Sequence, residues 1–381
     1  MRIAIDARIA HYTSAGIGQY AVHLAQALAR LDQANQYLLL QSRKDQRVLV
    51  AEPHVQRLGI WTPSHHRWEQ GALAVEFKLR PTLRRLKIDL LHSTDFIPPL
   101  RLSGFKSVIT VHDLAFLRWP HFLTEDSARY YGQVEAAVER ADHIIAVSES
   151  TKNDMVKLLG APAEKITVVY EAADPLYRPM ERAEALAALR GKYPLPDQFI
   201  LFVSTIEPRK NIVTLLRAYR RLLDAYKVEA GLVLAGATGW LSDQIFETVE
   251  QLDLQRHVTF LGRVPNGDLA SLYNLASCLA HPALYEGFGL TPLEAMACGT
   301  PVVVSNVSSL PEVVGDAALL IDPNSDEELA VALQRVLTDE TLSASLRAKG
   351  LARARTFSWE RTAEETLAVY RRAFGQSGGA S

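Results

Sequence analysis

The sequence has little of several features that mark specialised classes of protein. Its 381 residues include only two cysteines, Cys278 and Cys298, and neither has the close Cys or His spacing of a zinc site. We expect both to be buried thiols in a reducing compartment. Lysine plus arginine (41) nearly balance aspartate plus glutamate (43), which disfavours a protein that binds nucleic acid over its whole surface. No apolar run approaches the ~20 residues of a membrane-spanning helix, and the start lacks the apolar region of a signal peptide, so we expect a cytoplasmic protein.

What is present is the composition of an ordinary globular protein, with 48% hydrophobic and 22% charged residues. At ~150 residues per domain, the length predicts two domains. Short Val/Ile/Leu-rich runs alternate with amphipathic stretches of helix length along nearly the whole chain. This alternation predicts an α/β fold in which parallel sheets are covered by helices on both faces.

The predicted strands fall into two series separated by a proline-containing segment. The first series is 3–6, 37–41, 55–60, 90–92, 107–111, 143–147 and 166–169, and the second is 199–204, 231–235, 258–261, 278–281, 301–305 and 318–321. We therefore predict a Rossmann-like domain at 1–175, a linker at 176–196 and a second Rossmann-like domain at 197–357. We expect the helix at 358–375 to pack back on the first domain. Two doubly wound domains in tandem favour a cleft with the ligand at strand ends on both walls.

A capping box also marks the start of one late helix. Ser325 is followed three residues later by Glu328, which predicts a helix from there to about Leu337.

A small-residue loop follows the first predicted strand. Gly16, Gly18 and Ala21 fit the spacing of a dinucleotide fingerprint. The loop is displaced from Asp6, however, and the second strand ends in Gln41 rather than an acid, so a nicotinamide cofactor is disfavoured. Free N–H groups at a helix N-terminus favour an anion such as phosphate. A tight turn without a ligand is the alternative.

Two adjacent cations follow the first strand of the second series, in the stretch TIEPRKN at 205–211. Arg209 and Lys210 can neutralise a diphosphate and stabilise the charge that develops on it as a leaving group. Pro208 fixes the turn, and Asn211 is a candidate helix N-cap. A solvated surface charge pair is the alternative.

A third segment, 286–301, reads as a glycine loop followed by a helix and a strand. Gly287 and Gly289 allow the backbone to approach a ligand closely, and Gly299 suits the position just after a helix. Glu286 and Glu294 can each accept hydrogen bonds from vicinal hydroxyls, which ribose and hexoses offer. Solvated surface acids are the alternative.

Two further candidates lie in the first half. His112 follows the strand at 107–111, where a histidine is either structural or part of a site. The range 67–87 holds six basic and two acidic residues among aromatic side chains, which suits docking on an anionic membrane or a solvated helix face. The pair His65–His66 lacks further nearby ligands, so we interpret it as loop.

These motifs resemble glycosyltransferase family 4, the retaining enzymes of GT-B architecture, and the resemblance runs from Arg2 to the C-terminal helices. It rests on Glu286 and Glu294 with seven residues between them, continuing through AMACGTPVV, and on TIEPRKN, which looks like the bacterial mannosyltransferase-type members.

The resemblance implies roles for individual residues. The glycine loop at Gly16 would approach the donor diphosphate. Arg209 and Lys210 would form the phosphate site, although many members place the arginine five residues before the lysine, where this chain has Thr205. His112 would contact the donor sugar or the reacting groups. The remaining donor contacts would be Glu286 with the transferred sugar, the backbone of Gly287, Phe288, Gly289 and Leu290 with sugar and phosphates, Glu294 with the ribose, and Val264 near the base.

The chain contains no Asp-x-Asp motif, so a metal-bridged diphosphate has no obvious ligands, and we expect no metal or other cofactor. The leading hypothesis is a retaining transferase that uses a nucleotide-diphosphate sugar, best matched by GDP-mannose, with a glycan or lipid-linked acceptor. Front-face attack on an oxocarbenium-like centre is the mechanism that the family implies. The alternatives are a nucleotide-sugar epimerase or hydrolase on the same fold, and a non-catalytic protein that binds sugar nucleotides.

Overall fold

The computed structural model describes residues 1–13, 16–60, 81–96, 104–120, 125–239 and 241–375. The chain divides into two compact units. Unit 1 consists of Met1–Glu171 with Ser358–Ser381, and unit 2 of Ala172–Phe357. Each unit is built on one parallel sheet, and the two together have the α/β class that the sequence predicts.

Unit 1 contains a seven-stranded sheet with the order β3-β2-β1-β4-β5-β6-β7. Every strand predicted for the first half forms, and its ends lie within one residue of the prediction. The central strands are buried on both faces, which explains their nearly continuous apolar sequence. The strands are β1 (Arg2–Asp6), β2 (Gln36–Ser42), β3 (Val55–Ile60), β4 (Leu90–Ser93), β5 (Lys106–Val111), β6 (His143–Ala146) and β7 (Ile166–Val168).

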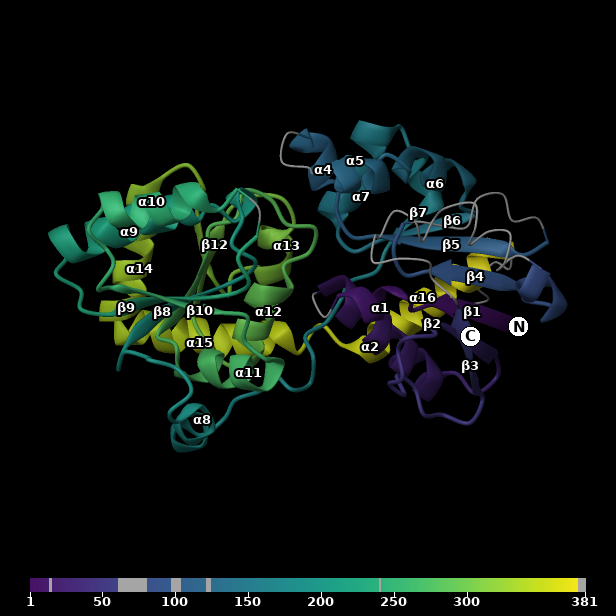
Figure 1. Cartoon of the computed structure of the whole chain (residues 1–381), viewed down its shortest axis with the longest axis horizontal. Coiled ribbons are helices and arrows are strands. Elements are labelled where there is room, and N and C mark those ends of the chain that lie inside the picture. Colours follow the sequence, from purple (N-terminus) through teal and green to yellow (C-terminus); the bar gives the residue numbers. More distant parts are fainter. Residues whose placement is uncertain (14–15, 61–80, 97–103, 121–124, 240, 376–381) are drawn as a thin grey trace. The chain divides into compact units, whose positions relative to one another are not determined.

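Helices cover both faces of this sheet, with α5, α6 and α7 on one side and α2 and α16 on the other (Figure 1). Their apolar stripes face the strands, as in other doubly wound sheets. The helical elements are α1 (Ile9–Tyr12), α2 (Gly16–Leu31), α4 (Ala115–Arg118), α5 (Glu125–Tyr131), α6 (Val134–Arg140), α7 (Glu149–Leu159), the 3-10 turn η3 (Ala163–Lys165) and α16 (Trp359–Ala373).

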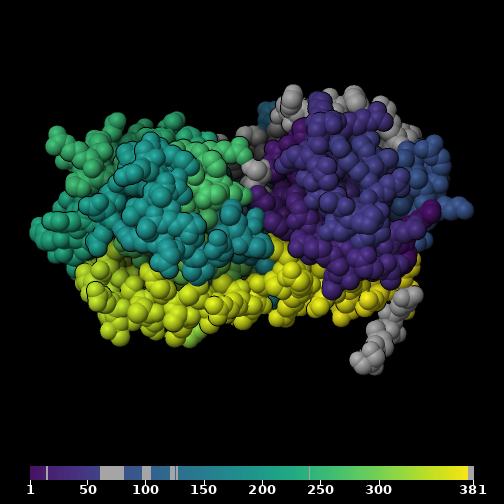
Figure 2. Space-filling view, turned by 90° about the horizontal axis from the view of Figure 1, so that it is seen from below, coloured from purple at the N-terminus to yellow at the C-terminus, as the bar shows by residue number. Residues whose placement is uncertain are grey.

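The C-terminal helix α16 belongs to unit 1 although 186 residues of unit 2 precede it. It packs along α2, and Figure 2 shows its yellow surface beside the purple N-terminal part of the chain. The Trp359 ring stacks on His23 with centroids 5.1 Å apart. The Tyr370 hydroxyl lies 2.7 Å from Nδ1 of buried His92. The last helix therefore completes the core of the first unit.

Unit 2 contains a six-stranded parallel sheet with the order β10-β9-β8-β11-β12-β13, and again every predicted strand forms. The strands are β8 (Phe199–Val203), β9 (Gly231–Ala235), β10 (Val258–Gly262), β11 (Cys278–His281), β12 (Val302–Ser305) and β13 (Leu319–Ile321). The helical elements are α8 (Arg182–Leu189), η4 (Pro208–Lys210), α9 (Ile212–Ala225), α10 (Asp243–Gln251), α11 (Asn266–Leu275), α12 (Leu290–Ala297), α13 (Leu310–Val314), α14 (Asp326–Thr338) and α15 (Glu340–Ala354).

The range 176–196, expected as a linker, lies within unit 2, where α8 packs on α11. Ala185 and Leu189 of α8 are almost fully buried, so this segment has apolar contacts of its own. Both cysteines are free and buried in this unit, as the sequence predicts.

The start of α14 confirms half of the predicted capping box. The Ser325 hydroxyl accepts a hydrogen bond of 3.1 Å from the N–H of Glu328. The Glu328 carboxylate does not return to Ser325 and instead accepts from the N–H of Asp322 at 2.9 Å. The reason is that the Ser325 N–H already donates to the Asp322 carbonyl, so only one side of the box is needed.

Candidate functional site

The candidate cations of unit 2 lie where the order in which strands are added to its sheet reverses. From β8 the chain builds outward through β9 and β10, then returns to add β11, β12 and β13 on the other side. Crevices at the carboxyl ends of strands bind ligands at such a switch point. Arg209 and Lys210 lie in η4, shortly after β8, and Glu286 lies in the loop after β11. Because β8 and β11 are paired in parallel, these residues meet at one edge.

The three side chains form a compact ionic cluster. Lys210 Nζ lies 2.5 Å from Glu286 Oε1, and Arg209 Nη1 lies 3.5 Å from Glu286 Oε2. Arg209 also donates to the Tyr285 carbonyl at 3.0 Å and to Glu207 Oε1 at 2.9 Å. The Lys210 side chain is 9% exposed and that of Arg209 is 20% exposed, so Arg209 is the more accessible cation.

The cluster keeps Glu286 ionised. Burial alone would raise the pKa of Glu286, but Lys210, His281 and Arg209 hold it well below its ordinary value. A largely buried carboxylate with cations on both oxygens is a preorganised electrostatic site, because its charges are fixed before any ligand arrives. An anionic ligand can take over the contacts that the two cations make with Glu286.

Two members of the cluster were missed from the sequence. His281 ends β11, and its Nε2 lies 2.8 Å from Glu286 Oε1. Burial lowers the pKa of His281 below its ordinary value, although Glu286 opposes this effect. Glu207 is the second, and its carboxylate accepts a hydrogen bond from Nη2 of Arg209. Two features of the sequence could have indicated them: His281 stands at the end of a predicted strand, and Glu207 stands two residues before Arg209.

Asn211 stands at the N-cap position of α9, but its side chain does not cap the helix. The predicted N-cap position is confirmed, but the side chain makes no capping bond, because Asn211 Oδ1 accepts from the Thr214 hydroxyl at 2.7 Å. The Asn211 amide N–H groups donate to the carbonyls of Pro282 at 3.0 Å and Pro323 at 2.7 Å. Its backbone is left-handed, with φ of 59°, a conformation that asparagine tolerates better than most residues. Asn211 therefore ties η4 to the loop after β11.

The loop from Glu286 to Leu290 is held by two serines. Ser308 Oγ accepts from the Glu286 N–H at 2.9 Å, and Ser309 Oγ donates to the carbonyls of Glu286 at 2.9 Å and Phe288 at 2.6 Å. Gly289 precedes α12 with φ of 115° and has no side chain to cap its N-terminus. Free N–H groups and the helix dipole make such an end suitable for phosphate.

The other two donor candidates of unit 2 lie in α12 and in the loop after β10. Glu294 lies within α12, is partly exposed, and accepts a hydrogen bond of 2.9 Å from the Tyr273 hydroxyl of α11. Burial and the charge of Asp174 outweigh this bond and raise the pKa of Glu294 to about 8. Val264 is half-buried in the loop between the outer strand β10 and α11.

His112 of unit 1 directly follows β5 and is engaged at both ring nitrogens. Nδ1 lies 3.0 Å from Glu171 Oε1, and Nε2 lies 2.9 Å from the Thr94 carbonyl. Burial lowers the pKa of His112, but Glu171 and further acceptors outweigh it, so the pKa is raised above its ordinary value. Both partners are acceptors, so the geometry fits an imidazolium that donates from both nitrogens.

The glycine loop has a steric reason for one of its glycines. Helix α2 begins at Gly16, and a Cβ placed on Gly18 would lie 2.0 Å from the Thr13 carbonyl oxygen. Gly18 is thus required by the close approach of the preceding turn. Gly16 stands at the N-terminus of a 16-residue helix, which is the position expected for an anion contact.

Several sequence predictions fall outside the described residues. The pair His65–His66 and the part of 67–87 before residue 81 belong to them, so the membrane contact stays a prediction. Within the described ranges, no helix is long and apolar enough to cross a membrane. In the same ranges, no group of three or more His, Cys, Asp or Glu side chains is arranged to hold a metal ion.

Comparison with known sequences covers both units. Residues 14–175 match the family described as Glycosyltransferase Family 4, and residues 189–353 match Glycosyl transferases group 1. The O-antigen chain mannosyltransferase B of Escherichia coli is 33% identical over 389 residues, covering 97% of this chain and 100% of that protein. The serotype-specific mannosyltransferase WbdA of Escherichia coli is 34% identical over 70% of this chain, which corresponds to 34% of that longer protein.

Solved structures agree on the fold. Sucrose-phosphate synthase from Thermosynechococcus elongatus has a TM-score of 0.80 at 24% identity, covering 99% of this chain and 100% of that one. The Anabaena HepE protein, solved with UDP and glucose, has a TM-score of 0.77 at 20% identity over 98% of this chain and 100% of that one. Both units have the Rossmann-like organisation of GT-B glycosyltransferases. Because full-length sequence similarity and both family matches agree, the chain belongs to glycosyltransferase family 4.

Proposed function

We propose that this glycosyltransferase is a retaining, metal-independent enzyme that moves mannose from GDP-mannose to a glycan or lipid-linked acceptor. The relatives that are named mannosyltransferases support the choice of sugar. The observation that carries the proposal is the cluster in which Lys210 and Arg209 hold Glu286 ionised at the switch point of the unit 2 sheet.

In this proposal the donor diphosphate replaces Glu286 as the partner of the two cations. Arg209 is the first contact because it is the more exposed, and Lys210 follows as its bond to Glu286 is released. The carboxylate of Glu286 is then free to accept hydrogen bonds from hydroxyls of the transferred sugar. The backbone from Gly287 to Leu290 adds N–H groups toward the sugar and phosphates, as a helix N-terminus does for anions.

Glu294 is proposed to accept hydrogen bonds from the two ribose hydroxyls, and Val264 to lie near the base. The carboxyl of Glu294 already accepts from Tyr273 and remains partly exposed. With its pKa raised to about 8, this carboxyl is mostly protonated at neutral pH in the free protein. Two donating hydroxyls favour its ionised form, so nucleotide binding should release a proton.

The proposed chemistry breaks the bond between the anomeric carbon and the diphosphate oxygen, and that oxygen keeps the electron pair. Arg209 and Lys210 stabilise the charge that develops on the leaving group. The acceptor hydroxyl attacks the same face of the oxocarbenium-like centre, and its proton passes to the departing phosphate. His112 is proposed to exchange its bond with the Thr94 carbonyl for one with a donor-sugar hydroxyl.

Thermal stabilisation by nucleotides tests the donor. Ligands that bind the native state raise the melting temperature, so GDP, UDP, ADP, GDP-mannose and UDP-sugars are compared, with NADH as the control. We expect selective stabilisation by the guanosine nucleotides. A uridine-selective shift would replace the donor, and a response to NADH alone would overturn the proposal.

A further inference from the structure

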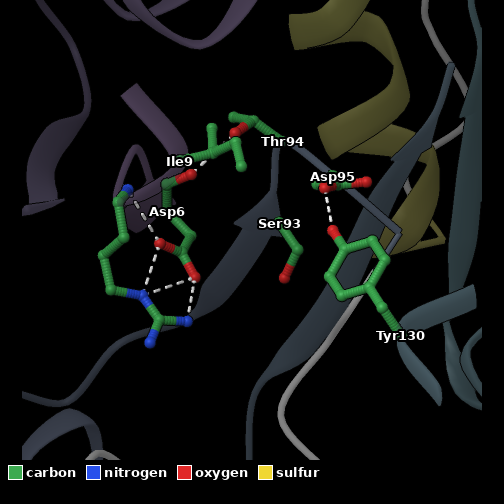
Figure 3. Close-up of a pocket in the computed structure, with 7 residues that line it drawn as sticks. Asp6, Ile9, Ser93, Thr94, Asp95 and Tyr130 are labelled. Atoms are coloured by element: carbon green, nitrogen blue, oxygen red, sulfur yellow. Dashed lines mark hydrogen bonds and ion pairs between the residues drawn. The ribbon is translucent and has the colours of Figure 1, made fainter. Parts of the chain in front are cut away.

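A pocket at the carboxyl edge of the unit 1 sheet has no role in the donor chemistry proposed above. Its enclosed part measures about 30 Å³, and the space including the open mouth about 350 Å³; its lining includes Asp6, Arg8, Ser93, Thr94, Asp95 and Tyr130 (Figure 3). Asp6 ends β1 and stands in register with Ser93 at the end of β4. Strands β2 and β3 lie on the outer side of β1, and β5 lies on the outer side of β4. The pocket therefore lies at the switch point of this sheet, where open α/β folds bind ligands.

Two polar atoms on the pocket walls lack partners. Arg8 donates from Nε to Asp6 Oδ1 at 2.8 Å and from Nη2 to Asp6 Oδ2 at 2.6 Å, and its side chain is only 6% exposed. Its remaining nitrogen, Nη1, is buried and has no hydrogen-bond partner among the described residues, and the same holds for Oγ of Ser93. Buried polar atoms are nearly always paired, so these two atoms indicate a ligand that offers oxygen atoms.

The charges around the pocket favour a neutral ligand over an anion. Asp6 cancels the charge of Arg8 through two parallel hydrogen bonds. Asp95, which accepts a hydrogen bond from Tyr130, adds a negative charge on the opposite wall. A phosphate or carboxylate would be repelled by Asp95, whereas a hydroxyl group can accept from Arg8 and donate to a carboxylate. Vicinal hydroxyls of a sugar match this pairing of donor and acceptor.

The pocket is connected to His112 through Thr94. The Thr94 hydroxyl donates to the Asp6 carbonyl at 2.7 Å, and the Thr94 carbonyl lies 2.9 Å from Nε2 of His112. Thr94, which lines the pocket, thus contacts His112, the residue of unit 1 that is proposed to take part in the reaction.

We infer that this pocket binds hydroxyl groups of the terminal sugar of the acceptor, with Arg8 and Ser93 facing one hydroxyl and Asp95 the next. The inference rests on the proposed function and adds a residue-level acceptor subsite for a neutral sugar. It also predicts that acceptor selection depends on unit 1 residues that make no contact with the donor.

Ser93→Ala is the principal test, because removing an unpartnered hydroxyl should leave the fold intact. Transfer from the donor is measured against a panel of methyl hexopyranosides as acceptors. The loss of one hydrogen bond should raise the acceptor KM by roughly 3- to 10-fold, while the donor KM and the melting temperature stay as in the parent protein. Arg8→Lys keeps the cation but removes Nη1 together with the paired bonds from Nε and Nη2 to Asp6, and it should raise the acceptor KM further.

Ser107→Ala is the matched control. Ser107 Oγ is also buried without a partner in the described part of the chain, but it lies on β5 and does not line the pocket. If Ser93→Ala and Ser107→Ala give the same acceptor KM, the inference is wrong. If inorganic phosphate competes with the acceptor for binding, whereas a second glycoside does not, the inference is also wrong and the pocket is an anion subsite. If the parent protein transfers sugar from no nucleotide donor, the proposed function itself fails, and the inference fails with it.

Discussion

Replacing Glu286 with glutamine tests whether the two cations of unit 2 are a diphosphate site. Glutamine keeps the shape and can still accept a hydrogen bond from Lys210, but it removes the charge. Arg209 and Lys210 are then left without this carboxylate, although both remain in the same largely buried position. A nucleoside diphosphate should replace the missing charge. We therefore expect the free variant to be destabilised and the nucleotide-bound variant to recover.

The expected magnitude follows from the burial of the cluster. Breaking a buried ion pair costs about 3–5 kcal/mol, and the low end applies because glutamine retains a hydrogen bond. For a unit of this size, 1 kcal/mol corresponds to about 2–4 °C in Tm. We expect the free variant to lose about 6–12 °C and to regain several degrees more on binding GDP than the parent protein does.

Differential scanning calorimetry with and without GDP measures both quantities. GDP carries no sugar, so the assay isolates the diphosphate from the sugar contact assigned to Glu286. Asp224→Asn is the control, because it breaks an exposed pair with Arg220 in α9 and should change Tm by less than about 2 °C. Equal GDP-induced shifts in the parent protein and in Glu286→Gln would refute the diphosphate assignment.

Three further predictions follow from the same geometry. The double variant Arg209→Ala and Lys210→Ala should lower kcat by two or more orders of magnitude, on the scale of about 10²–10³ for one lost charge-stabilising donor, and initial-rate kinetics at saturating donor would detect it. The folded protein retains the Glu294 proton up to a pKa of about 8, whereas an unfolded glutamate loses it near 4.5, so the stability of the fold falls as pH rises between these values. The Tm of Glu294→Gln should therefore rise relative to the Tm of the parent protein between pH 6 and pH 9. A Tm difference that does not change with pH would contradict the raised pKa. Gly18→Ala should cost about 1–3 kcal/mol in urea unfolding because its Cβ meets the Thr13 carbonyl, whereas Gly267→Ala, which meets nothing within 4 Å, should not destabilise the protein.

The central strands could be predicted from the sequence because burial on both faces removes ambiguity. Residues 199–203 read Phe-Ile-Leu-Phe-Val, and all five are buried in β8. Such a run between turn residues has few alternatives to a central parallel strand. The same logic placed Arg209 and Glu286 at strand ends, and parallel pairing then brought them to one edge.

The partners within the site could not be predicted, because they depend on side-chain directions that spacing does not encode. His281 reaches Glu286 across a loop of four residues, and the Asn211 side chain bonds two distant carbonyls and the Thr214 hydroxyl instead of capping an N–H of its helix. Arg8 and Asp6 are two residues apart, a spacing that has no meaning until the turn after β1 is known. Local pattern gives the elements, whereas the tertiary fold decides which polar groups meet.

The anomeric configuration of the product tests the central claim most directly. GDP-α-mannose is incubated with the protein and an acceptor glycoside, and the anomeric configuration of the new glycosidic bond is determined by NMR. We expect an α-linked mannoside, because attack on the same face retains the configuration. A β-linked product would contradict the retaining mechanism, and transfer from a uridine donor but not from GDP-mannose would contradict the donor.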